Sequence, residues 1–299
     1  MDTDSLRAFV AVADSGSFSQ AAERLFLTQS AISKRIAALE SRIDAPLFDR
    51  IGRRITLTEA GHTLMPRARQ ILAMFEDTQR ALTNLSGRVH GRLSLATSHH
   101  IGLHRLPPVL ARYRKRWPEV SLDMQFLDSE QAYQGVQSGA LELALATMAP
   151  QTPVHITAAP LWVDRLHFVC AADHPLAHGT RLSLAALAEF DAVLPGEQTF
   201  TRAMVTDAFE RSGLTVGVSM STNYLETIRM LVSTGLGWSV LPETLLDDSI
   251  HCLDVAHPPI ERPLGYLFHD HRTLSNAARA MLEVLEASRE TDGNDIATR

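Results

Sequence analysis

The sequence is poor in the features that mark secreted, disulfide-stapled or membrane-spanning proteins. Its 299 residues include two cysteines, and a pair 82 positions apart in the sequence makes neither a disulfide framework nor a zinc-ligand pattern. No apolar run approaches the roughly 18–20 residues that a membrane span needs. The acidic start, MDTDSLRAF, lacks the basic region of a secretory signal. We therefore expect a cytoplasmic protein that does not enter a membrane.

Apolar and charged residues occur in ordinary globular proportions, but the charge is unevenly distributed. Hydrophobic residues make up 45% and charged residues 21% of the chain, which excludes wholesale disorder, and the length predicts two or three domains. Residues 1–92 carry 13 basic and 10 acidic side chains, whereas residues 93–299 carry 15 basic and 24 acidic ones. A mildly basic head on an acidic body indicates that only the head meets a polyanion. A random fluctuation of charge is the alternative.

The first part of the head has the apolar spacing of three short helices. The first two apolar stripes are Leu6, Phe9, Val10 and Ala13, then Phe18, Ala21, Ala22 and Leu25. Between them, Gly16 is placed as a left-handed cap and Ser17 as the next N-cap. Thr28 is placed to cap a third helix, with a predicted buried face of Ile32, Ile36, Leu39 and Ile43. Two short helices, a tight turn and a longer third helix predict a helix-turn-helix.

The outward side of the third helix carries hydrogen-bonding side chains near its start. These are Thr28, Gln29, Ser30, Ser33, Lys34 and Arg35. A recognition helix enters the DNA major groove by its N-terminal residues, which need donors and acceptors. Gln29 suits an adenine edge, while Lys34 and Arg35 suit phosphates, which position a protein without specifying sequence. An ordinary solvated helix face is the alternative interpretation.

A basic hairpin is predicted directly after the third helix, which ends at 46–48. Alternation about Gly52 predicts two short strands with Ile55 and Leu57 facing inward. The tip of this hairpin would carry Arg50, Arg53 and Arg54. A basic wing beside a recognition helix can hold backbone phosphates or reach the adjacent minor groove.

Three runs of this region together resemble the N-terminal signature of LysR-type transcriptional regulators. They are FSQAAERLFLTQSAISKRIAALE (Phe18 to Glu40), LFDR (Leu47 to Arg50) and LTEAG (Leu57 to Gly61). The resemblance implies that residues 1–58 are a winged helix-turn-helix DNA-binding domain, in which the polar residues named above contact DNA. Many family members carry proline where this chain has Ser30, a departure that predicts a change in base preference.

A long helix capped by Thr58 is predicted to follow the wing. Its heptad seam is Leu64, Ala68, Ile71, Phe75, Thr78, Leu82 and Leu85, the spacing of a two-stranded coiled coil. A helix packed on its own domain is the alternative, and Pro66 is expected to bend or fray the helix near its front. The resemblance implies a linker and dimerisation helix over residues 59–90, with subunits paired through 59–86.

Pairing of two heads has a consequence for the DNA that the protein reads. Two heads held by one coiled coil would read a pseudo-palindromic site in double-stranded DNA, because operator symmetry mirrors protein symmetry. LysR-type proteins commonly form homotetramers, so the resemblance also implies two such sites with bent DNA between them. Access of RNA polymerase would then depend on the geometry of the tetramer.

Residues 91–299 alternate short apolar runs with helical patterns, which predicts β-α-β units and a parallel sheet. In the first lobe we expect strands at 92–96, 120–127 and 141–146 and helices at 106–117 and 130–137. In the second lobe we expect strands at 166–171, 216–222 and 237–241 and helices at 202–211 and 224–233. A strand at 264–268 and a helix at 274–288 return to the first lobe.

This pattern predicts a two-lobed α/β body, which resembles the periplasmic-binding-protein fold. Lobe I would comprise about 91–163 and 266–290, and lobe II about 164–265, so the whole chain is an α+β protein in two parts. Such folds bind small ligands between the lobes, where strands end and helices begin. The polar residues at those ends are Thr97, Ser98, His99, His100, Thr147, Gln198, Thr199, Phe200, Thr201 and Asn223.

Hydroxyls and backbone N–H groups at helix starts favour an anion as the effector, either a small carboxylate or an inorganic oxyanion. His99 or His100 would supply charge or a hydrogen bond. Hydroxyls that simply cap their own helices are the alternative for each residue taken singly.

No metal, cofactor or redox site is assigned from the sequence. His100 and His104 have the i, i+4 spacing of zinc-binding pairs, but no third ligand follows from spacing. Cys170 falls in an apolar strand, as a small core residue would. The peroxide-sensing branch of the family uses two cysteines close together, whereas Cys170 and Cys252 are far apart.

No catalytic motif is present either. The chain lacks a G-x-S-x-G elbow, a Walker loop, a dinucleotide glycine fingerprint and an H-E-x-x-H helix. An enzyme or a simple ligand carrier remains the rival class for the body, but neither needs a basic helix-turn-helix on a dimerising helix. We therefore expect a LysR-type regulator, not an enzyme, whose body senses a small molecule by shifting a conformational equilibrium.

Overall fold

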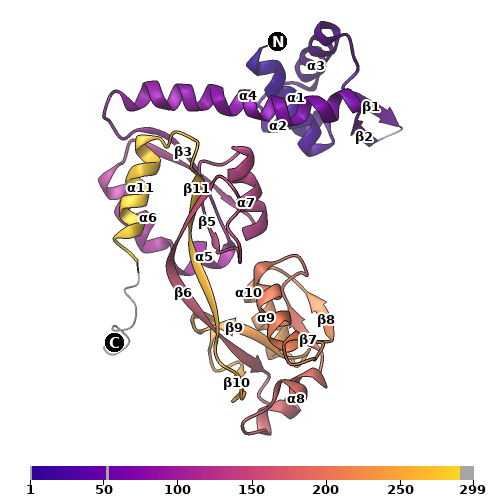
Figure 1. Ribbon diagram of the computed structural model, residues 1–299, viewed down its shortest axis with the longest axis vertical. Helices are drawn as coiled ribbons and strands as arrows, with labels where there is room; N and C mark the ends of the chain where they lie inside the picture. The colour runs from indigo at the N-terminus through magenta and orange to yellow at the C-terminus, as the bar shows by residue number, and fades with distance from the viewer. Residues whose placement is uncertain (1, 52–53, 290–299) are drawn as a thin grey trace. The chain divides into compact units, whose positions relative to one another are not determined.

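The computed structural model (Figure 1) describes residues 2–51 and 54–289 of the protein. The chain divides into two compact units, one of residues 1–86 with 138–140 and one of residues 87–137 with 141–299. Among the described residues, none of the helices combines the length and the hydropathy of a transmembrane span.

The first unit is a small helical domain with a hairpin and a long final helix. Its elements are α1 (Thr3–Ser15), α2 (Phe18–Arg24), α3 (Gln29–Ile43), β1 (Phe48–Ile51), β2 (Arg54–Leu57) and α4 (Glu59–Asn84). The predicted caps are confirmed: Gly16 has φ 61° after α1, and the Ser17 and Thr28 side chains accept N–H bonds at the starts of α2 and α3. Local capping chemistry therefore sets the helix boundaries.

The core of this unit lies where α1, α2 and α3 meet. The Phe48 ring lies 5.4 Å from that of Phe9 and 5.9 Å from that of Phe18. The predicted buried face of α3 is confirmed for Ile32, Ile36 and Leu39. It is wrong for Ile43, which is 36% exposed, because α3 ends there with Asp44 in a left-handed conformation.

The predicted hairpin is present as an antiparallel pair in which Arg50 lies opposite Ile55. Ile55 and Leu57 are partly buried against the core of the domain, as expected. Thr58 then caps α4, accepting an N–H bond from Gly61 at 3.0 Å. Only glycine fits at position 61, since a Cβ atom there would lie 2.3 Å from the Leu47 carbonyl oxygen.

Helix α4 runs for 26 residues and passes through Pro66 without a break, so the expected fraying does not occur. Leu64 and Met65 pack partly buried against the core of the domain, and Ala68 is wholly buried in it. This packing keeps the turn around Pro66 helical, although proline has no backbone N–H to donate there.

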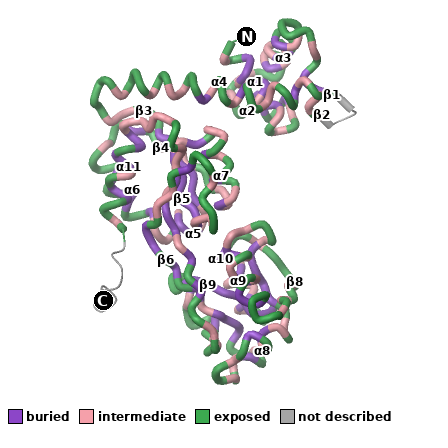
Figure 2. The backbone as a smooth tube through the Cα atoms, in the orientation of Figure 1, coloured by how far each residue is buried: buried purple, intermediate pink, exposed green. Residues whose placement is uncertain are grey.

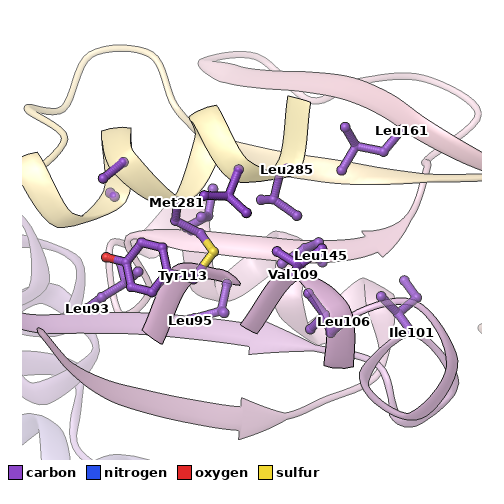
Figure 3. Packing of buried hydrophobic residues seen from close by; sticks show 14 of the residues in the cluster. Leu93, Leu95, Ile101, Leu106, Val109, Tyr113, Leu145, Leu161, Met281 and Leu285 are labelled. Atoms are coloured by element: carbon purple, nitrogen blue, oxygen red, sulfur yellow. The ribbon is translucent and has the colours of Figure 1, made fainter. Parts of the chain in front are cut away.

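The first lobe of the second unit is built around a parallel sheet. Its elements are β3 (Gly91–Thr97), α5 (His99–His104), α6 (Pro107–Arg116), β4 (Val120–Phe126), α7 (Ser129–Ser138), β5 (Leu143–Thr147) and α11 (Asn276–Glu286). Strand β3 pairs in parallel with β4 and with β5, as predicted. Figure 3 shows α6 and α11 packed on this sheet through Tyr113 and Met281. The Tyr113 hydroxyl donates to the Ala277 carbonyl at 2.8 Å.

Two long antiparallel strands, β6 (Ile156–Cys170) and β11 (Ile260–His269), run from one lobe into the other (Figure 1). The strand order is β10-β6-β11-β5-β3-β4, where β10 is His251–Cys252, and β9 (Ser239–Pro242) is also paired to β6. The predicted strands at 166–171 and 264–268 are therefore only parts of β6 and β11. Pro160 and Asp164 interrupt the apolar pattern of β6, which hid the continuity of the strand.

In the second lobe the innermost segments are buried (Figure 2). Its elements are η1 (Pro175–His178), α8 (Leu184–Ala188), β7 (Ala192–Leu194), α9 (Phe200–Glu210), β8 (Val218–Ser221), α10 (Leu225–Ser233), β9 (Ser239–Pro242), η2 (Glu243–Leu245) and β10 (His251–Cys252). Strand β7 pairs in parallel with β8. Trp238 is wholly buried here, and its Nε1 donates to the carbonyls of Leu187 and Phe190 at 2.9 Å.

Candidate functional site

The start of α3 presents a row of polar side chains to solvent. Thr28, Gln29, Ser30 and Lys34 are exposed, while Ser33 and Arg35 are half-buried. The hydroxyls of Thr28 and Ser30 lie 3.0 Å apart. Arg35 forms an ion pair with Asp4 of α1 at 3.2 Å, so it is held back against its own domain. The row offers donors, acceptors and a positive charge within about two helical turns.

The hairpin carries two of the three predicted wing arginines within its strands. Arg50 lies on β1 and Arg54 on β2, which places both at the tip end of the pair. Arg53 lies outside the described residues. Phe26 precedes α3 with φ 54° and a side chain 96% exposed, and this exposure was not predicted. An aromatic residue in an apolar run is normally expected in the core, so nothing in the sequence distinguished Phe26 from its apolar neighbours.

The heptad seam of α4 divides into two parts. Leu64 and Ala68 belong to the core of the domain. Beyond them the seam turns outward: Ile71 is 40% exposed, Leu82 64% and Leu85 83%. An apolar row of this kind on a single chain is the surface that a second helix covers in a coiled coil.

A cleft lies between the two lobes of the second unit, and its empty volume, including the space at its opening to solvent, is about 490 Å³. Its lining residues are Ser98, His99, His100, Asp128, Ser129, Glu130, Thr147, Pro195, Thr199, Thr201, Asn223, Leu225 and Arg262. Most of them come from the ends of strands β3 and β5 and from the starts of helices α5, α7, α9 and α10, whereas Pro195 follows β7 and Arg262 lies in β11. This is where a two-lobed α/β fold binds small ligands.

Two carboxylates of lobe I reach across the cleft to lobe II. Glu130 Oε1 accepts a hydrogen bond from the backbone N–H of Phe200, the first residue of α9, at 2.6 Å. Asp128 Oδ2 accepts one from Asn223 Nδ2 at 2.7 Å. Burial raises the pKa of Glu130, and the charge of Asp128 adds to that effect. The positive end of the α9 dipole is thus occupied by a carboxylate of the chain itself.

A buried ionic cluster lies beside the cleft and includes two of its lining residues, His100 and Arg262. Asp164 is 1% exposed and accepts from Arg262 at 2.5 Å and from Arg105 at 2.8 Å, and it lies 3.1 Å from His100 Nε2. Burial alone would raise the pKa of Asp164, but these three neighbours outweigh it and hold that pKa well below its usual range. Burial lowers the pKa of His100 more than Asp164 raises it.

Seven of the ten predicted effector residues line the cleft: Ser98, His99, His100, Thr147, Thr199, Thr201 and Asn223. The other three do not line it. Thr97 is wholly buried, Gln198 is exposed, and the half-buried Phe200 ring packs on Tyr133 with centroids 5.6 Å apart.

Three charged residues of the cleft were not predicted from the sequence: Asp128, Glu130 and Arg262. The first two follow the end of β4, a signal that could have been used. Arg262 lies within strand β11, and no spacing of residues in the sequence marks that position as part of a binding site.

Family comparisons agree with this architecture. A model described as the lysR-family bacterial regulatory helix-turn-helix protein matches residues 3–62, and one described as the LysR substrate binding domain matches residues 86–289.

Individual relatives resemble either nearly the whole chain or a part of it. The RuBisCO operon transcriptional regulator of Allochromatium vinosum is 30% identical, over 95% of this chain and 96% of its own. An uncharacterized HTH-type transcriptional regulator of Azotobacter vinelandii is 62% identical over 40% of this chain and 88% of its own. Among solved structures, full-length CbnR in complex with its target DNA shares the fold with a TM-score of 0.65 at 20% identity, covering 96% of this chain and 100% of that one. This chain belongs to the LysR family of transcriptional regulators.

Proposed function

We propose that the protein binds double-stranded DNA through the start of α3 and the wing, and binds a small-molecule effector in the cleft between lobes. The observation that carries the DNA-binding role is the exposed row of Thr28, Gln29, Ser30 and Lys34 at the N-terminal end of α3. Side chains there can reach base edges in the major groove. Ser33 and Arg35 would complete the row, with Arg50, Arg53 and Arg54 on the flanking phosphates.

The exposed part of the α4 seam supports a homodimer formed through residues 59–86, with the tetramer as a pair of such dimers. Two heads joined in this way would read a pseudo-palindromic operator, and effector-dependent changes in tetramer geometry would alter access of RNA polymerase. A regulator of this kind acts in the cytoplasm, on the chromosome, and is not an enzyme.

Gln29→Ala is expected to relax base discrimination in DNA binding. Removing a bidentate reader of a base edge costs about 1–3 kcal/mol at the base pair that it contacts. Binding would be measured on DNA from upstream of the protein's own gene and on single-base variants of the bound site, across a salt series. Equal losses on every sequence would contradict the assignment.

Lys34→Ala is the matched control for this experiment. A phosphate contact is independent of sequence, so binding should weaken to a similar degree on all DNA. The slope of log K against log salt should also fall by about one. Gln29→Ala should leave that slope unchanged.

The contacts across the cleft suggest how an effector acts. Glu130 occupies the N-terminus of α9, the position in the cleft best suited to an anion. An anionic effector would take the place of this carboxylate and break one of the bonds that join the lobes. The effector site that we propose consists of the seven predicted residues that line the cleft, with Asp128, Glu130 and Arg262 added.

Glu130→Gln is therefore expected to strengthen oxyanion binding by about tenfold, because it removes a like charge within a few ångströms of the ligand. Calorimetry with sulfate, phosphate and succinate on the full-length protein would measure the effect. Glu210→Gln makes the same charge change at the exposed far end of α9 and should leave affinity unaltered. Identical affinities in the wild type and in Glu130→Gln would exclude the α9 N-terminus from the effector site.

A further inference from the structure

Two histidines and a carboxylate from different lobes converge beside the cleft. His100 and His104 lie on α5 of lobe I, with ring centroids 4.8 Å apart, and Glu226 lies in the first turn of α10 of lobe II. One ligand atom from each of the three lies within 4.8 Å of the others. His104 Nε2 and Glu226 Oε1 are 3.1 Å apart, close to the roughly 3.3 Å between two ligands of a tetrahedral zinc ion.

His100 supplies an independent observation that points to a ligand. Its side chain is 4% exposed, yet neither ring nitrogen makes a hydrogen bond with the described residues. Asp164 Oδ2 lies 3.1 Å from Nε2. One nitrogen of a neutral imidazole carries a lone pair that a metal ion can take. A carboxylate that orients the ring from behind is the usual second partner of a metal-bound histidine.

We propose that His100, His104 and Glu226 bind a divalent first-row metal ion of the zinc class. Two imidazoles and one carboxylate are ligands that such ions accept, and a tetrahedral ion would keep its fourth position for water or another ligand. The i, i+4 spacing on α5 presents both imidazoles on one helix face. Because Glu226 comes from the other lobe, the bound ion joins lobe I to lobe II. Metal occupancy thereby stabilises the closed cleft.

The chain contains a second cluster that serves as the control. His155, Asp270 and His271 also gather their ligand atoms within 4.8 Å, but all three are exposed. Unlike the trio between α5 and α10, this group lies within one lobe, at the ends of β6 and β11, and has no buried member. Metal bound there would not link the lobes.

The test uses the full-length protein, freed of metal by a chelator and titrated with Co²⁺. The wild type and His271→Gln are expected to show the visible absorption of tetrahedral cobalt at one equivalent. His104→Gln and Glu226→Gln should lose that absorption and bind at least roughly 10- to 100-fold more weakly, because even a partner that only orients a metal ligand contributes that much to affinity. The side chains of His104 and Glu226 are 27% and 32% exposed. Because neither belongs to the buried core, both variants should fold.

A second readout separates a lobe-bridging site from simple metal capture. Zn²⁺ should raise the thermal unfolding midpoint of the wild type and of His271→Gln but not that of His104→Gln or Glu226→Gln, since ligands stabilise only the state that binds them. Loss of the cobalt spectrum in His271→Gln alone would assign the ion to the exposed cluster and overturn the proposal. So would the absence of any cobalt spectrum in the wild type. Glu130 and Gln29 take no part in this site, so its failure leaves the proposed DNA and effector roles intact.

Discussion

Asp164→Ala is expected to lower the free energy of unfolding of the effector-binding unit by about 3–5 kcal/mol. The substitution leaves Arg262, which is 4% exposed, without the carboxylate that neutralises it, and removes the acceptor for Arg105. Denaturation by urea would be followed by tryptophan fluorescence. All three tryptophans, at positions 117, 162 and 238, lie in this unit, so the signal reports it alone.

The matched control is Asp123→Ala, which removes a carboxylate from an ion pair at the surface. Its partner Arg92 is 72% exposed, and such pairs contribute at most about 1 kcal/mol. A similar small loss for Asp164→Ala would contradict the role given to the buried cluster. Replacing both Asp164 and Arg262 by apolar residues should recover much of the stability, because Arg262 is then no longer a buried charge without its carboxylate.

Leu82→Lys is expected to dissociate the protein into monomers and to weaken operator binding by about a hundredfold or more. Leu82 is 64% exposed on the single chain, so the change leaves the fold of the head intact while placing a charge in the seam of the coiled coil. The loss of affinity follows because two linked heads gain 10²–10⁴ in avidity over one, roughly. Sedimentation equilibrium and a DNA-binding titration would measure both effects.

Thr83→Lys provides the comparison for this prediction. It adds the same charge one residue along α4, at an exposed position off the heptad seam. Oligomeric state and operator affinity should therefore match those of the wild type. If both variants were monomeric, or if neither were, the seam would not be the surface that pairs the subunits.

Much of the head followed from local sequence. Capping at Ser17, Thr28 and Thr58 and the left-handed Gly16 set the helix ends where they were predicted, because these interactions involve residues no more than four apart. The error at Ile43 has the opposite origin. Its apolar side chain fits the helical stripe, but burial depends on what the rest of the domain places opposite the last turn of α3.

The lobes were less predictable because their strands are shared. An apolar run in β6 was visible at 166–171, but the earlier part of the strand, which Pro160 and Asp164 interrupt, was recognisable only from its pairing with β11. Short elements such as α5 and β7 carry too few residues for periodicity to show. Hydroxyl and histidine positions in the cleft could be listed from strand and helix ends, whereas Arg262 could not, since nothing in its neighbourhood along the chain marks it.

The sequence by itself determined the family, the helix-turn-helix with its exposed polar row, the long helix and the two-lobed plan of the body. These depend on spacing, capping and motif order, which are properties of neighbouring residues. Only the tertiary structure decided which side chains meet across the lobes: Glu130 with the start of α9, Asp164 with Arg262, and Glu226 with His104. Each partner is 60 or more residues away, so its position depends on the packing of both lobes around β6 and β11.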